Sequence, residues 1–74
     1  MFTGTVKWFN PKAGYGHIKA ENGEDIYVHI SNVHPYDVLH IGEGDPVRFE
    51  LRYGIQGVEA RNVAKMPRNM FHSV

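Results

Sequence analysis

The sequence predicts a small all-β protein of five short strands, arranged as a barrel or a sandwich. Short runs of strand-forming residues alternate with turn residues along most of the chain. No stretch shows a sustained helical period with capping residues at its ends, so a long helix is not expected. The 74 residues suit one domain and leave no room for a second.

The first three strands are predicted at residues 3–10, 15–20 and 25–30. The first of them ends at an Asn-Pro pair, because proline cannot donate a hydrogen bond to a neighbouring strand. A long loop is expected from Ser31 to Asp45, where a His-Pro pair and two glycines interrupt any regular structure.

The last two strands are predicted at residues 46–53 and 58–65, joined by the Gly-Ile-Gln-Gly turn. The fourth strand alternates cleanly, and its expected core face comprises Val47, Phe49, Leu51 and Tyr53. The domain is expected to span residues 1–66. Residues 67–74 show no usable period and are expected to form a flexible C-terminal tail.

Alternation in the second and third strands predicts an outward aromatic patch. The apolar residues of each strand must face the core, which leaves a Tyr-x-His pattern outside on both strands. A three-residue loop at residues 21–23, with Gly23 in a left-handed conformation, keeps both apolar sets on one side. The resulting opposed pairs are Tyr15 with His29, His17 with Tyr27, and Lys19 with Asp25.

This patch suggests single-stranded nucleic acid as the ligand. Exposed contiguous aromatic surface usually marks an interaction site, and every base offers a flat face on which to stack. Lys7 and Lys12 border the patch in sequence and can contact phosphates, while Gly14 and Gly16 suggest close approach of a backbone or ligand. A purely structural role for the cross-strand aromatic pairs is the alternative.

Two segments resemble the ribonucleoprotein-type motifs of the bacterial cold-shock proteins. The first motif is matched by KWFNPKAGYGHI at residues 7–18, and the second by IYVHI at residues 26–30. The similarity extends from about residue 3 to residue 65. It implies a five-stranded antiparallel β-barrel of the OB type that binds single-stranded RNA and DNA. It also implies action as an RNA chaperone or as a regulator of transcription or translation.

The resemblance assigns roles to individual residues. Lys7 and Trp8 match the family, Lys7 as a phosphate or base-edge contact and Trp8 as a stacking platform. Tyr15 and Tyr27 stand where the family usually has Phe and are expected to stack. His29 also matches and is expected to stack on a base or hydrogen-bond its edge.

Several positions depart from the family pattern. His17 and Ile30 each replace a Phe, and Lys12 lies one place before the usual lysine. In the long loop the family Phe aligns with Val38, and Tyr36 lies near enough to substitute for it. These changes predict binding about tenfold to several-hundredfold weaker than the family norm. Protonation of His17 would attract phosphate, so binding is expected to strengthen at lower pH.

Composition narrows the function classes further. The net charge is zero, but three lysines and no acid occur in residues 1–20, whereas seven acids and one arginine occur in residues 21–50. Affinity must therefore depend on more than counterion release. Neutrality and exposed aromatic residues also suit a protein-interaction module, which is the alternative function, with a protein partner in place of nucleic acid.

No enzyme, metal site or cofactor is expected. The chain shows no nucleophile with a partnered base, and it has five histidines but no cysteine, which makes a poor set of zinc ligands. No apolar run is long enough for a signal peptide or membrane span, so a cytoplasmic protein is expected. A monomer is favoured over a strand-exchanged dimer.

Overall fold

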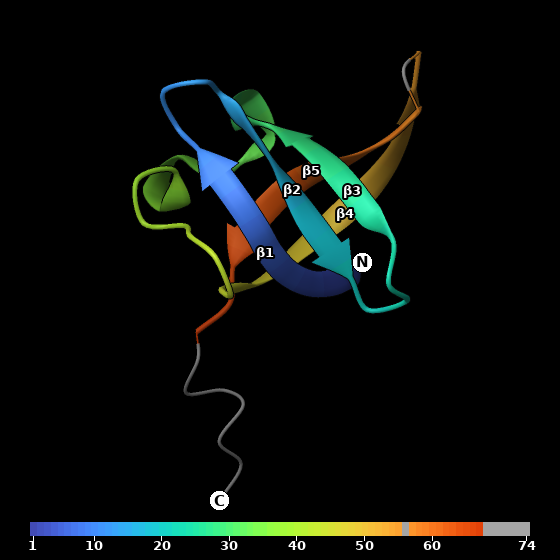
Figure 1. The fold of residues 1–74 in the computed structure, drawn as a ribbon, viewed down its shortest axis with the longest axis horizontal. Helices are drawn as coiled ribbons and strands as arrows, with labels where there is room; N and C mark the ends of the chain where they lie inside the picture. Colours follow the sequence, from blue (N-terminus) through green and yellow to red (C-terminus); the bar gives the residue numbers. More distant parts are fainter. Residues whose placement is uncertain (56, 68–74) are drawn as a thin grey trace, which may run out of the picture.

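The computed structural model describes residues 1–55 and 57–67 of the chain. It confirms the predicted five-stranded barrel, which is closed in the strand order β1-β2-β3-β5-β4 (Figure 1). Two short 3-10 helices, η1 and η2, lie in the long loop between β3 and β4. The elements are β1 Phe2–Asn10, β2 Tyr15–Ala20, β3 Asp25–His29, η1 Ile30–Asn32, η2 Pro35–Asp37, β4 Pro46–Gly54 and β5 Gly57–Lys65.

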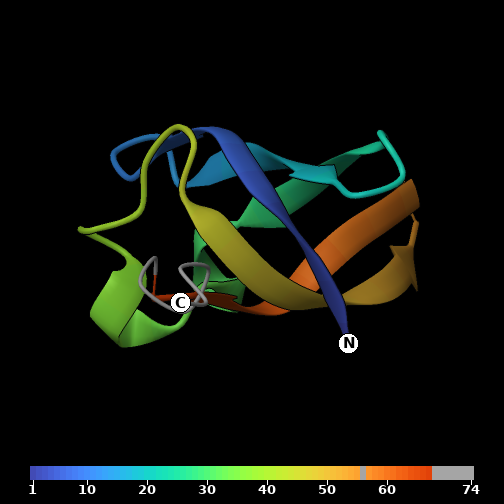
Figure 2. The ribbon, with the colours of Figure 1, turned by 90° about the horizontal axis from the view of Figure 1, so that it is seen from below.

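Four of the strand pairings are antiparallel, and the fifth, which closes the barrel, is parallel. This short parallel contact joins β3 to β5 through Tyr27 opposite Glu59 and Val28 opposite Ala60. Figure 2 shows the long loop at one end of the barrel, beside the β1–β2 turn, with the β2–β3 and β4–β5 turns at the other end. The predicted tail lies outside the described residues, apart from Pro67. No helix in the described part of the chain is long and apolar enough to cross a membrane.

The β2–β3 hairpin has the predicted register. Tyr15 lies opposite His29, and His17 lies opposite Tyr27. Gly23 has a φ of +93°, and its N–H donates to the Ala20 carbonyl over 2.9 Å. Because an L side chain is strained at this φ, glycine at position 23 lets the turn close without moving either strand by one residue.

The core consists of the inward residues of all five strands and two residues from the long loop. Its largest fully buried side chains include Phe49 and Ile18, neither of which has any exposed surface. The buried set is Val6, Ile18, Ile26, Val28, Val33, Ile41, Val47, Phe49, Ala60 and Val63. This burial supplies the main stabilising free energy of a small domain that has no cysteine and hence no disulfide.

Two expectations about the core are wrong. Ile30 was expected to end the third strand on its core face, but β3 ends at His29 and Ile30 begins η1, half-buried. Tyr53 was expected on the core face of β4, but it is 80% exposed. Tyr53 pairs with Val58 beside the turn, where the β4–β5 hairpin extends past the barrel interior.

A β-bulge in β1 decides which side chains of that strand face outward. Val6 pairs with Ile18 and Trp8 pairs with His17, so Lys7 is the extra residue. Strict alternation would place Trp8 on the inner side with Val6, whereas the bulge leaves both Lys7 and Trp8 exposed. The bulge therefore makes Trp8 available to a ligand.

Gly16 allows β1 and β2 to approach closely next to this bulge. A Cβ atom at position 16 would overlap the Trp8 carbonyl oxygen and lie 2.8 Å from the Phe9 Cα atom. The expected close approach at Gly16 is therefore made by the backbone of β1.

Candidate nucleic-acid interface

Four rings from three adjacent strands form one continuous exposed surface, which we call the aromatic face. They are Trp8 of β1, Tyr15 and His17 of β2, and Tyr27 of β3. Trp8 stacks on His17 with a centroid distance of 5.2 Å and meets Tyr15 edge-on at 5.4 Å. Tyr27 stacks with Tyr15 at 6.1 Å and meets His17 edge-on at 6.3 Å. The four contacts form a closed circuit of rings.

The rings of the aromatic face remain in contact with water although they touch one another. Trp8, Tyr15 and Tyr27 are 39%, 40% and 36% exposed. Contacts of this geometry stabilise each ring's orientation, so a ligand meets a surface that is already ordered. An ordered, partly exposed apolar surface gains free energy when bases cover it.

His29 lies at the margin of the aromatic face. It is opposite Tyr15, but its hydrogen-bond partner is Ser31, whose backbone N–H donates to the His29 Nδ1 atom over 3.1 Å. The Ser31 hydroxyl lies 2.9 Å from the same nitrogen. Because Nδ1 accepts the hydrogen bond from the Ser31 N–H, the ring proton is assigned to Nε2.

Lys7 forms an ion pair with Asp25 across the width of β2. The Lys7 Nζ atom lies 3.1 Å from the Asp25 Oδ2 atom. This hydrogen bond is the main cause that lowers the pKa of Asp25 below its ordinary value, with smaller contributions from the charges of Lys7, Lys19 and His17. The predicted opposition of Lys19 and Asp25 is confirmed, but the ion pair is made by Lys7. A phosphate at Lys7 therefore competes with Asp25.

Lys12 lies in the turn between β1 and β2, and its side chain is exposed. The Asn10 Oδ1 atom accepts hydrogen bonds from the backbone N–H groups of Lys12 and Ala13, at 3.0 and 3.1 Å. Ile30 lies beside the same turn, where its N–H donates to the Gly14 carbonyl over 2.9 Å. Within the described residues the Lys12 ammonium forms no ion pair, so it is available to phosphate.

Tyr36 lies apart from the aromatic face, in η2. It is 83% exposed and stacks with His34 at a centroid distance of 5.6 Å and an interplanar angle of 14°. The backbone N–H of Tyr36 also donates to the His34 Nδ1 atom over 3.3 Å. His34 is not among the predicted site residues, although Pro35 between the two rings is a sequence signal for a fixed turn at this point.

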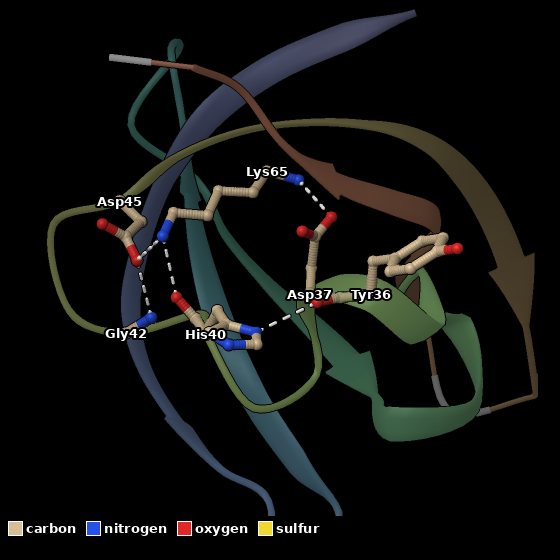
Figure 3. Close-up of polar contacts among 6 residues, drawn as sticks. All are labelled: Tyr36, Asp37, His40, Gly42, Asp45 and Lys65. Carbon is tan, nitrogen blue, oxygen red and sulfur yellow. Dashed lines mark hydrogen bonds and ion pairs between the residues drawn. The ribbon is translucent and has the colours of Figure 1, made fainter.

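Hydrogen bonds and an ion pair join the loop that carries Tyr36 to Lys65 at the end of β5 (Figure 3). The Lys65 Nζ atom donates to the His40 carbonyl over 2.9 Å and lies 3.6 Å from the Asp45 Oδ2 atom. The backbone N–H of Lys65 donates to the Asp37 carboxylate over 2.9 Å. Within the loop itself, the His40 Nδ1 atom lies 3.1 Å from the Tyr36 carbonyl oxygen. These contacts fix the position of the loop backbone that carries Tyr36.

The described residues contain no group of three or more His, Cys, Asp or Glu side chains arranged to hold a metal ion. The histidines of this part of the chain are instead distributed between ring contacts and loop hydrogen bonds. The arrangement as a whole offers flat apolar faces, two lysines and one imidazole donor.

Comparison with known proteins gives a consistent result. A family model described as the "cold-shock" DNA-binding domain matches residues 2–66. The cold shock protein CspC of Bacillus subtilis is 43% identical over 65 residues, covering 88% of this chain and 98% of that protein. The cold shock-like protein CspLB of Listeria monocytogenes is 42% identical over 66 residues, covering 89% of this chain and 100% of that protein.

A solved structure also resembles the chain. The protein described as Drosophila Unr CSD456 matches with a TM-score of 0.74 at 20% sequence identity, over 92% of this chain. This chain spans only 27% of that longer one, and at this identity the likeness supports the fold alone.

Proposed function

The chain belongs to the cold-shock family of nucleic-acid-binding domains, and we propose that it binds single-stranded RNA and DNA by stacking unpaired bases on the aromatic face. The observation that supports this best is the closed circuit of Trp8, Tyr15, His17 and Tyr27 on β1, β2 and β3. Duplexes are disfavoured as ligands because their bases are already stacked on one another.

The residues around the aromatic face supply the polar contacts in this proposal. Lys7 and Lys12 contact phosphates, with Lys7 exchanging its Asp25 partner for the ligand. His29 donates from Nε2 to a base edge. Ile30 offers an apolar edge, and Tyr36 offers a separate ring for a base further along the strand.

Two lysines make only a small electrostatic contribution to the binding free energy, so stacking supplies most of the affinity in this proposal. Each stacked base contributes about 1–3 kcal/mol, and stacking distinguishes poorly between bases. Pyrimidine-rich strands are the preferred ligands in this proposal because they unstack most easily. Broad, stacking-based binding suits an RNA chaperone or a regulator of transcription or translation. The proposal includes no catalytic role or cofactor, and it places the protein in the cytoplasm as a monomer.

Trp8, the one tryptophan of the chain, reports directly on this proposal. We expect a short oligothymidine strand to quench Trp8 fluorescence, to saturate at micromolar strand or below, and to bind more weakly as salt rises. At fixed salt, binding at pH 6 is expected to exceed binding at pH 8, because a protonated His17 attracts phosphate.

The outcome decides between nucleic acid and a protein ligand. Unchanged Trp8 fluorescence in a folded protein would contradict the proposal and favour the protein-interaction module, which the zero net charge also suits. Quenching that does not depend on pH would remove His17 from the proposal but leave the stacking surface intact.

A further inference from the structure

A cavity of about 320 Å³ lies on the side of the barrel formed by β4 and β5, next to η1 and η2. Its size is at the lower end of the range for small-ligand sites. Apolar side chains form part of its lining. The polar part consists of Ser31, Asn32, His34, Arg48 and Asn62.

The lining of this cavity contains no carboxylate. The four other cavities compared in the described part of the chain each include at least one Asp or Glu. Arg48 forms no ion pair among the described residues. Glu50, two residues after Arg48 on β4, accepts a hydrogen bond from the Asn62 amide over 2.8 Å. The lining of the cavity therefore carries the positive charge of Arg48 and no acid, in a protein of zero net charge.

The chemistry of this lining suits a phosphate group. The Arg48 guanidinium can donate two parallel hydrogen bonds to phosphate oxygens, a geometry that a single ammonium cannot offer. The Asn32 and Asn62 amides and the Ser31 hydroxyl are further donors. Asn62 has a φ of +52°, which is uncommon for a residue other than glycine, and it lies where the register between β4 and β5 shifts.

The cavity is connected to the aromatic face through one residue. Ser31, which lines the cavity, is also the hydrogen-bond partner of His29 at the margin of the aromatic face. His34, which also lines the cavity, stacks on the exposed ring of Tyr36. Ser31 therefore places the cavity next to His29, at the margin of the aromatic face.

We propose that this cavity binds a backbone phosphate of a nucleic-acid strand longer than the aromatic face, with Arg48 as the main contact. The inference rests on the proposed function, because it requires the strand to be held first on the aromatic face. It adds a second, electrostatic point of attachment on the β4–β5 side of the barrel. Free inorganic phosphate is the other source of the same chemistry.

The test compares oligothymidine strands of about six and about twelve nucleotides, lengths within the usual range for one barrel of this type. Affinity is measured by Trp8 quenching at several salt concentrations for the wild type, Arg48→Gln and Arg52→Gln. Arg52 is the matched control because it lies four residues further along β4, is also exposed, and lines a cavity that contains Glu59.

For the longer strand, Arg48→Gln is expected to lower the slope of log affinity against log salt by about 0.7, the value for one phosphate of a single strand. With this difference in slope, the ratio of wild-type affinity to Arg48→Gln affinity falls about threefold as salt rises from about 50 to 200 mM. The shorter strand is expected to bind both forms equally, and Arg52→Gln is expected to match the wild type with both strands.

Equal loss for Arg48→Gln and Arg52→Gln, or no loss for Arg48→Gln with the longer strand, would overturn the inference. The side-chain amide NMR signals of Asn32 and Asn62 are expected to shift with the longer strand and to stay unchanged with equimolar orthophosphate. Equal shifts with orthophosphate alone would mean that the cavity binds free phosphate rather than a phosphate of the strand, and would overturn the inference. Absence of quenching by the shorter strand would instead overturn the proposed function, so the two failures are distinguishable.

Discussion

Replacing Tyr15 by alanine is expected to weaken binding far more than it weakens the fold. Tyr15, like His17, contacts both Trp8 and Tyr27, so its loss opens the circuit of rings and leaves His17 alone to join Trp8 to Tyr27. Losing one stacked base costs about 1–3 kcal/mol, which is about 5- to 150-fold in affinity. The two lost cross-strand ring contacts cost about 0.2–1 kcal/mol each in the free energy of unfolding.

The assay is titration with a short oligothymidine strand, followed by Trp8 fluorescence, alongside chemical denaturation of the same samples. Tyr53→Ala is the control, because Tyr53 is 80% exposed on β4, outside the aromatic face. It removes an equally large ring and is expected to leave affinity unchanged. The reasoning would be refuted if Tyr15→Ala bound like the wild type, or if Tyr53→Ala lost as much affinity.

Three further predictions concern the support of the interface. Gly16→Ala is expected to lower the free energy of unfolding by about 2 kcal/mol or more in denaturant titrations, because the new methyl group overlaps the backbone of β1, whereas Gly42→Ala, in open space, is expected to change it little. Lys7→Gln is expected to raise the pKa of Asp25 toward its ordinary value, measured by NMR titration of the carboxylate. Because that pKa is lowered in the folded protein, the ion pair stabilises the fold at pH values above the unfolded-state pKa of Asp25. This stabilisation is lost as pH falls through the lower, folded-state pKa. If the pKa of Asp25 were the same in Lys7→Gln as in the wild type, Lys7 would not be the cause of the lowering. Lys65→Met is expected to speed amide exchange across the loop at residues 37–45, and unchanged exchange would mean that the loop is held without it.

The β2–β3 hairpin was predictable because two independent constraints agree on its register. Alternation fixes which residues face the core, and Gly23 permits the one turn that joins the strands without a shift. The opposition of Tyr15 to His29 and of His17 to Tyr27 follows from these constraints alone. Half of the candidate site therefore follows from local sequence.

The rest of the site depends on features that alternation does not encode. The bulge at Lys7 reverses the side on which Trp8 lies, and a bulge depends on how β1 fits its partner strand rather than on its own pattern. The partner of Asp25 is Lys7 on β1 rather than the directly opposite Lys19, and strand alternation does not distinguish between these two lysines. The His34–Tyr36 pair and the β3–β5 closure involve the long loop and distant segments, which local patterns do not place.

His17 shows how a protein of zero net charge can retain a nucleic-acid surface. The imidazole stacks on Trp8 at an interplanar angle of 17°, so the flat surface continues through a residue that replaces the usual Phe. The same ring lies edge-on to Tyr27 and close enough to Asp25 for its charge to contribute to the lowered pKa of that carboxyl. The imidazole therefore combines a flat face for stacking with ring nitrogens that can hydrogen-bond a base edge or a phosphate, so position 17 exchanges part of the apolar contact of a Phe for a polar one.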